Sequence, residues 1–219
     1  MNPESSVDLL RKWDFDVNQT PLEESTLPHR FEFQALRLLA HGEPVSAEMV
    51  GSKLGIPKKI AQAVFDASRG KGEWDSEGRL IGSALTLVPT QHRFRVMDNN
   101  LYTWCAHDTI FLPGLLGMTA EVMSPDPLKG DLIKLVITPK GPETYTPKSA
   151  VLTIFQASEP ALGPTSAVCT NSHYFISQAS AEAWSQDRPG VTIMTVEDAF
   201  SHIKRILLDP VQPILDQLN

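Results

Sequence analysis

Residues 46–64 read SAEMVGSKLGIPKKIAQAV and define the character of the first half of the chain. Ser46 is a good N-cap for a helix that Gly55 ends, and Pro57 stands near the first turn of the next helix. Upstream, an apolar stripe from Phe31 to Leu39 has helical spacing and stops at a glycine. The segment and its flank therefore predict three short helices in succession.

Short strands are predicted directly after these helices, at Leu80-Ile81, Leu85–Leu87 and His92–Val96. Three helices followed by a small sheet are typical of a winged helix, so DNA binding is one hypothesis. The segment that would read bases has Lys58 and Lys59 and then mostly apolar residues, which leaves few donors for base edges. We therefore interpret the module as structural and do not expect a nucleic acid partner.

The second half of the chain predicts a sheet with flanking helices. Asp98-Asn99-Asn100 looks like a turn that caps a helix over Leu101–Leu116. Apolar and alternating runs then predict strands, and two later segments predict helices. The strands are Ala120–Met123, Leu132–Thr138, Val151–Gln156 and Val168–Ile176, and the helices are Ser180–Gln186 and Thr195–Leu208.

The predicted fold class is α+β. An N-terminal winged-helix-like three-helix module with a small wing precedes a small mixed or antiparallel sheet domain with flanking helices. We divide the chain into an N-terminal arm (1–28), the winged-helix-like domain (29–97) and an α+β domain that carries the candidate site (98–219). Residues 1–28 are interpreted as a short helix followed by an irregular arm, and Pro210 and Pro213 interrupt the tail after Leu208.

The composition and the net charge argue against several classes of protein. The 219 residues are 42% hydrophobic and 21% charged, as in an ordinary folded protein, and the net charge is −7. An acidic chain is a poor fit to a nucleic acid or an anionic membrane. The N-terminus lacks the order of a signal peptide, and no stretch of about 18 apolar residues occurs. With two cysteines and no disulfide framework, a reducing cytoplasm is expected, where both thiols stay free.

The two cysteines are the candidate reactive groups. Cys105 and Asp108 lie three residues apart, so on a helix both side chains would share a face and meet a common atom. Cys169 lies in a segment that reads as a strand. Burial as small apolar side chains remains the alternative for both thiols. A protease would need a histidine base, and although His92 or His173 could approach in the fold, neither has protease-like flanks.

The sequence has no pattern typical of a structural zinc site or of a nucleotide-binding site. The cysteines are 64 positions apart, with no CxxC or HxxxH, which is poor material for a structural zinc site. Glycine-rich phosphate loops are also missing, so no nucleotide cofactor is expected.

Five segments, in order, resemble the alkylmercury (organomercurial) lyase family. They are Glu43–Ser46, Glu73–Gly82 with Leu85–Leu87, Leu101–Thr109 with Phe111, Pro113 and Gly117, Cys169 with His173–Phe175, and Ala181–Trp184 with Val196–Phe200. The resemblance implies protonolysis of the carbon–mercury bond, which yields a hydrocarbon and Hg(II) in mercury detoxification.

The family's reactive residues fall on Cys105, Asp108 and Cys169, which the resemblance also implies as ligands of the product Hg(II). Cys105 would capture the organomercurial first, Cys169 would add a second sulfur, and Asp108 would deliver the proton. Tyr102 and Trp104 flank Cys105 and are candidates for the substrate pocket or for core packing. One departure is Thr170, where family members often carry a further cysteine.

The resemblance implies no resident cofactor. Small external thiols would remove the product, and a mercuric reductase is a candidate acceptor of the ion. Two alternatives stay open: a winged-helix sensor of mercury or another soft metal that uses the same thiols, and a homologue that binds such a metal without turnover.

Overall fold

The computed structural model describes residues 26–155 and 163–218. The segment predicted as an N-terminal arm lies almost wholly outside the described residues. Within the described part, no helix is both long and apolar enough to cross a membrane.

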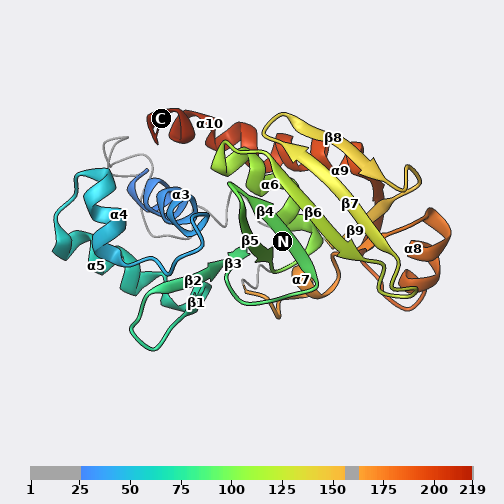
Figure 1. Cartoon of the computed structure of the whole chain (residues 1–219), viewed down its shortest axis with the longest axis horizontal. Helices are drawn as coiled ribbons and strands as arrows, with labels where there is room; N and C mark the ends of the chain where they lie inside the picture. Colours follow the sequence, from blue (N-terminus) through green and yellow to red (C-terminus); the bar gives the residue numbers. More distant parts are fainter. Residues whose placement is uncertain (1–25, 156–162, 219) are drawn as a thin grey trace, which may run out of the picture.

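Three helices at one end of the molecule confirm the first prediction: α3 (Leu27–Leu39), α4 (Ala47–Leu54) and α5 (Lys58–Ala67) (Figure 1). The Ser46 hydroxyl accepts the Met49 amide at 3.2 Å and so caps α4. Gly55 ends α4 in the left-handed region with φ of 68°, which glycine adopts without a Cβ penalty. The spacing in residues 46–64 thus translates directly into two helices.

The strands form two antiparallel sheets, which confirms the α+β class. The larger sheet has the order β1-β2-β3-β5-β4-β6-β7-β8, and the smaller has the order β10-β9-β11. The strand bounds are β1 Glu73–Trp74, β2 Leu80–Ser83, β3 Leu85–Thr86, β4 His92–Val96, β5 Asn99–Thr103, β6 Ala120–Pro125, β7 Leu132–Thr138, β8 Gly141–Thr146, β9 Val151–Phe155, β10 Tyr174–Phe175 and β11 Val191–Thr195.

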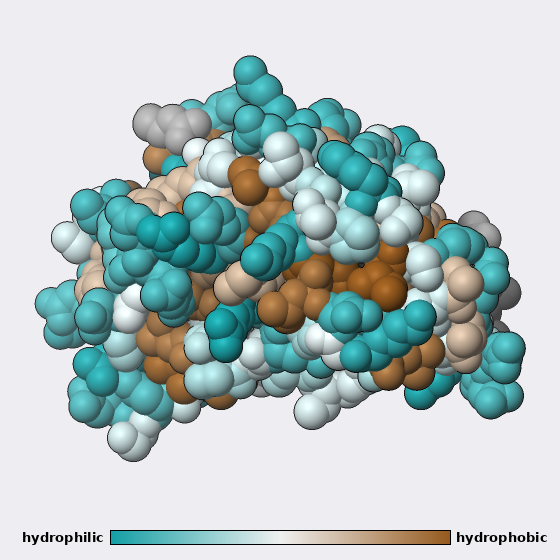
Figure 2. All heavy atoms as spheres, turned by 45° about the vertical axis from the view of Figure 1, so that its right-hand side comes forward, coloured by the Kyte–Doolittle hydropathy of each residue, from teal (hydrophilic) through white to brown (hydrophobic). Residues whose placement is uncertain are grey.

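Helices pack on the sheets, and one apolar core connects both halves of the chain. Leu39 of α3, Ile110 of α6, Ile137 of β7 and Ile203 of α9 are fully buried in the same cluster. The remaining helical elements are α6 Ala106–Leu116, α7 Ala167–Thr170, α8 Gln178–Ser185, α9 Val196–Ile203, the π-helix Lys204–Leu208, α10 Asp209–Leu215, and the 3-10 turns Arg69–Lys71 and Asp216–Leu218. On the face drawn in Figure 2, hydrophilic residues predominate and apolar residues gather near the centre.

The predicted helix over Leu101–Leu116 is wrong in its first third. Met97 and Asp98 have φ of 48° and 65°, and Val96 pairs with Asn99. Two left-handed residues between paired strands make a tight hairpin turn that matches strand twist. The chain therefore returns as strand β5, and the helix begins only at Ala106. The boundary predicted between residues 97 and 98 falls in this hairpin, and the division into domains stays a prediction.

The strand predicted over Val168–Ile176 is also wrong in its first half. Residues Ala167–Thr170 form the single-turn helix α7, and only Tyr174-Phe175 extend as β10. Ser166 explains the difference, because its hydroxyl accepts the Cys169 amide at 3.2 Å and starts a helical turn.

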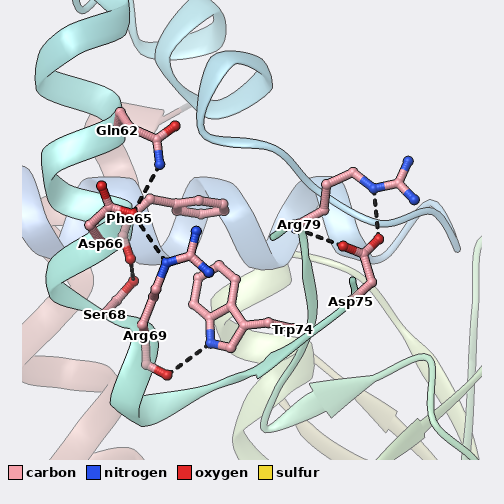
Figure 3. A network of polar contacts seen from close by, with 8 residues as sticks. All are labelled: Gln62, Phe65, Asp66, Ser68, Arg69, Trp74, Asp75 and Arg79. Atoms are coloured by element: carbon pink, nitrogen blue, oxygen red, sulfur yellow. Dashed lines mark hydrogen bonds and ion pairs between the residues drawn. The ribbon is translucent and has the colours of Figure 1, made fainter. Parts of the chain in front are cut away.

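The hairpin β1–β2 is held by contacts to α5 and to the 3-10 turn that follows α5, and by an ion pair within its own turn (Figure 3). The Trp74 indole donates to the Arg69 carbonyl at 3.0 Å and packs edge-on against Phe65 with 4.8 Å between ring centroids. Arg79 and Asp75 form an ion pair at 2.7 Å across the turn. These contacts give the small hairpin a fixed place beside the three helices.

Candidate active site

Cys105 stands at the boundary between β5 and α6. It has extended backbone angles (φ −152°, ψ 176°) and serves as the N-cap of α6. Its sulfur accepts the Asp108 backbone amide, and the Asp108 carboxylate accepts the Cys105 amide at 2.9 Å. This reciprocal pair is a capping box, with cysteine in the place usually taken by serine or threonine. The helix start therefore fixes the thiol and the carboxyl relative to each other.

Cys169 approaches from the other side on α7. A backbone hydrogen bond joins the two cysteine segments, since the Ala106 amide donates to the Ser172 carbonyl at 3.2 Å. Ser172 is itself tied to α7, because its hydroxyl donates to the Val168 carbonyl at 2.7 Å. These bonds bring together two thiols that are far apart in sequence.

Cys105, Asp108 and Cys169 form one buried cluster. Each contributes one sulfur or oxygen atom, and these atoms all lie within 4.8 Å of one another. The exposed fractions are 0% for Cys105, 6% for Asp108 and 8% for Cys169, so little water reaches the groups. Among the described residues, no other group of three metal-ligating side chains is found this close together. The three residues that the sequence singled out are thus the three that the fold assembles.

The protonation states of the cluster follow from burial and mutual hydrogen bonding. Burial raises the pKa of Cys105, and its hydrogen bond with Cys169 acts in the same direction. That hydrogen bond lowers the pKa of Cys169 to about 7, and Ser166 adds to the effect against burial. Burial raises the pKa of Asp108 well above its usual range, with the Cys169 charge as a second cause.

Because a dry site tolerates few charges, the favoured arrangement near neutral pH is a single thiolate on Cys169. Cys105 then keeps its proton and donates it in a hydrogen bond to that thiolate. Burial and the Cys169 charge favour the protonated form of Asp108. The cluster therefore combines two soft sulfur atoms with an adjacent carboxyl group.

Tyr102 and Trp104, which precede Cys105 in the sequence, are half-buried. Side chains alternate along a strand, so Tyr102 lies on the opposite face of β5 from Thr103. The Trp104 indole donates to the Glu73 carboxylate at 2.8 Å, which links β5 to the hairpin of β1. Their membership of a substrate pocket stays a prediction.

Several residues around the cluster were not found from the sequence. Ser166 caps α7 and hydrogen bonds to Cys169, and its position three residues before the cysteine was a usable capping signal. Tyr174 is fully buried, and its hydroxyl lies 2.8 Å from that of Thr109. Thr109 already donates to the Ala106 carbonyl at 2.7 Å, so Tyr174 is the donor in this bond. No local pattern predicts that long-range pair.

His92 and His173 approach each other rather than the thiols, with stacked rings 6.1 Å apart. Neither acts as the base that a cysteine protease requires, because their ring nitrogens bond Gln91, Ser124 and a carbonyl. A buried pair of thiols with an adjacent acid instead defines a protein that handles a soft metal through sulfur.

Comparison with known proteins identifies the group more closely. The sequence model of the family "Alkylmercury lyase" matches residues 85–207. The chain is 34% identical over 192 residues to the alkylmercury lyase of Staphylococcus epidermidis, covering 87% of this chain and 88% of that protein. It is 36% identical over 166 residues to that of Streptomyces lividans, covering 75% and 76%. The chain belongs to the alkylmercury lyase family.

A solved structure shares the fold. The crystal structure of the mercury-bound form of MerB2 superposes with a TM-score of 0.67 at 23% identity and covers 95% of this chain and 99% of that one. The family resemblance drawn from five sequence segments is confirmed by the family model and by the two relatives, and the solved structure shows the shared fold.

Proposed function

We propose that the protein cleaves the carbon–mercury bond of alkyl- and aryl-mercury compounds by protonolysis and releases a hydrocarbon and Hg(II). The observation that carries this proposal is the buried cluster of Cys105, Asp108 and Cys169, with reactive atoms within 4.8 Å. Mercury is a soft metal that prefers thiolates, and the carbon bound to it can leave only when it receives a proton. The cluster supplies both.

Capture of the substrate falls to Cys169. An organomercurial arrives bound to a small thiol, the Cys169 thiolate attacks mercury, and the small thiolate leaves. Cys105 was the expected first nucleophile from the family resemblance. The reverse order is proposed because Cys169 is the more accessible sulfur, 8% exposed against 0% for Cys105, and its hydrogen bond with Cys105 lowers its pKa, which favours the reactive thiolate.

Cleavage then uses the two remaining protons. Asp108 donates its proton to the carbon, the carbon–mercury bond breaks, and the hydrocarbon leaves. Cys105 passes its proton to Asp108 and binds mercury through sulfur. One carbon–mercury bond and one S–H bond are lost, while one C–H bond and one mercury–sulfur bond form. Asp108 ends as it began and acts as a general acid and then a base.

Turnover requires removal of Hg(II) from two buried sulfurs. Small external thiols are suited to this exchange, and a mercuric reductase is the proposed acceptor. The protein would carry out the reaction without a resident cofactor. A cytoplasmic location fits two free thiols in a chain with an acidic net charge.

For α3–α5 with the β1–β2 hairpin, we propose a winged-helix-like arrangement with a structural role. Its exposed Lys58 is paired with Glu48 at 2.9 Å, which lowers its value for phosphate contact. The hairpin instead reaches the active site, since Glu73 accepts the Trp104 indole next to Cys105. A sensor of mercury that binds DNA would shift a labelled fragment at low salt, and we expect no shift.

The decisive experiment incubates the purified protein with methylmercury and an excess of a small thiol. Methane and inorganic mercury are measured, with a thiol-only reaction and Cys105→Ser as controls. We expect methane from the native protein alone. Mercury binding without methane above the thiol-only reaction would refute the enzyme proposal and leave a binding protein.

A further inference from the structure

We propose that Gln91, His92 and His173 act as a positioning clamp that holds Cys169 in reach of Cys105. We call these three side chains the Gln91 clamp. The inference rests on the proposed roles of the two cysteines. It assigns a function to the paired histidines, which take no part in the chemistry described above.

The donor and the acceptor can be assigned in each hydrogen bond of the clamp. His173 Nε2 lies 3.0 Å from the Thr170 carbonyl, which can only accept, so Nε2 carries the proton. Nδ1 of a neutral His173 is then an acceptor, and the Gln91 amide nitrogen donates to it at 3.1 Å. The same amide nitrogen lies 3.1 Å from His92 Nε2.

The chain of bonds ends at Ser124. His92 Nε2 accepts from Gln91, so the proton of the neutral ring is on Nδ1, which lies 2.8 Å from the Ser124 hydroxyl. An amide NH₂ has two hydrogens, and Gln91 uses one for each histidine. Both rings are thus fixed in one tautomer by one side chain. Burial lowers the pKa of both histidines, for His92 to about 3, which keeps the rings neutral as this pattern requires.

The clamp connects the supports of the two cysteines. His92 on β4 pairs with Thr103 on β5, and the Thr103 hydroxyl donates to the Cys105 carbonyl at 2.9 Å. At the other end, His173 holds the carbonyl of Thr170, the residue that follows Cys169 and ends α7. Through these hydrogen bonds, Gln91 links β4 and β5, which lead to Cys105, to α7, which carries Cys169.

The Cys169 segment needs such a support. Helix α7 has four residues, and a single turn has too few hydrogen bonds to be stable by itself. The following strand β10 has only two residues. Binding of mercury by two sulfurs requires both to reach the metal together, and small errors in the position of a reactive group lower rates strongly.

Gln91 offers a clean test because its side chain is exposed and its replacement removes little packing. Gln91→Glu keeps the size of the side chain, but a carboxylate only accepts hydrogen bonds. It would face His92 Nε2 and His173 Nδ1, which are both acceptors in the native protein. We expect kcat for methane release and the affinity for Hg(II) to fall about 2- to 10-fold, the range for loss of one or two hydrogen bonds. KM and the unfolding midpoint should stay close to their native values.

Gln178→Ala is the matched control, since Gln178 is also exposed and donates to a side chain, Glu182, at 2.9 Å away from the clamp. His173 gives a second pair of variants. His173→Gln keeps a donor near the Thr170 carbonyl and should retain most of the activity, whereas His173→Leu removes it. The ultraviolet absorbance of mercury bound by two thiolates reports the fraction of two-sulfur binding directly.

The results separate the clamp from the enzyme proposal. If native protein releases methane and Cys169→Ser does not, the roles of the cysteines stand. Native values of kcat and two-thiolate absorbance in both Gln91→Glu and His173→Leu would then overturn the clamp alone. Equal losses in His173→Gln and His173→Leu, with Gln91→Glu unchanged, would also overturn it and indicate a packing role for the ring.

Discussion

Replacement of Asp108 by asparagine isolates the proton from the structure around it. The carboxyl is buried, and burial raises its pKa well above the usual range, which favours the protonated acid. An amide has the same size and keeps an oxygen to accept the Cys105 amide, now bonded at 2.9 Å. We therefore expect stability within about 1 kcal/mol of native and retained binding of Hg(II).

Turnover should respond very differently. A positioned general acid contributes about 10²- to 10⁴-fold, and an amide cannot replace it, so methane release should fall by at least about 100-fold. Asp108→Ala is the contrasting variant. It leaves the buried Cys105 amide without its acceptor and should lose about 1–3 kcal/mol of stability as well as activity.

The assay measures methane from methylmercury by gas chromatography, Hg(II) affinity by competition with a chelating thiol, and stability by urea unfolding. A rate for Asp108→Asn within threefold of native would refute the assignment of the proton to Asp108. Loss of Hg(II) binding in the same variant would show that Asp108 serves mainly as a ligand.

Three further outcomes are expected. Cys169→Ser should abolish methane release and remove the thiolate absorbance step near pH 7, the value to which its pKa is lowered, as followed in an ultraviolet pH titration. Methane release by the native protein should rise with pH through about 7 as the Cys169 thiolate forms, and a profile that is flat through this range would contradict this. Gly82→Ala should destabilise the protein by about 1–3 kcal/mol in urea unfolding, because the new Cβ would overlap the Glu73 carboxylate and displace it from its hydrogen bonds with Thr86 and Trp104.

Sequence patterns predict those parts of the fold whose signals are local. Ser46 and Gly55 define α4, and Thr195, whose hydroxyl accepts the Asp198 amide at 3.1 Å, starts α9 as expected. The strand β8 carries no such signal, because its sequence GPETYT is polar and forms the edge of the sheet. Val191–Thr195 does carry a β-branched signal typical of a strand, which sequence reasoning missed.

The errors near the active site have a common physical cause. Of the predicted turn Asp98-Asn99-Asn100, only Asp98 lies in the turn, and Asn99 and Asn100 begin β5. The same residue types favour both helix caps and hairpins, and only pairing with β4 decides between them. The spacing of Cys105 and Asp108 predicts proximity whether Cys105 lies in the helix or caps it. Cys169 could be assigned to the same site only through the family resemblance, because a contact across 64 positions depends on the whole fold.

The capping box at the start of α6 also has a consequence for the history of the enzyme. Serine is among the best N-cap residues, so Cys105→Ser should unfold at a temperature equal to or above that of the native protein while being inert. Selection for activity would then have kept cysteine at position 105, although serine is the better N-cap and would give a more stable protein. A stable, inactive serine variant would in turn be a practical means of trapping an intact organomercurial in the pocket for crystallography.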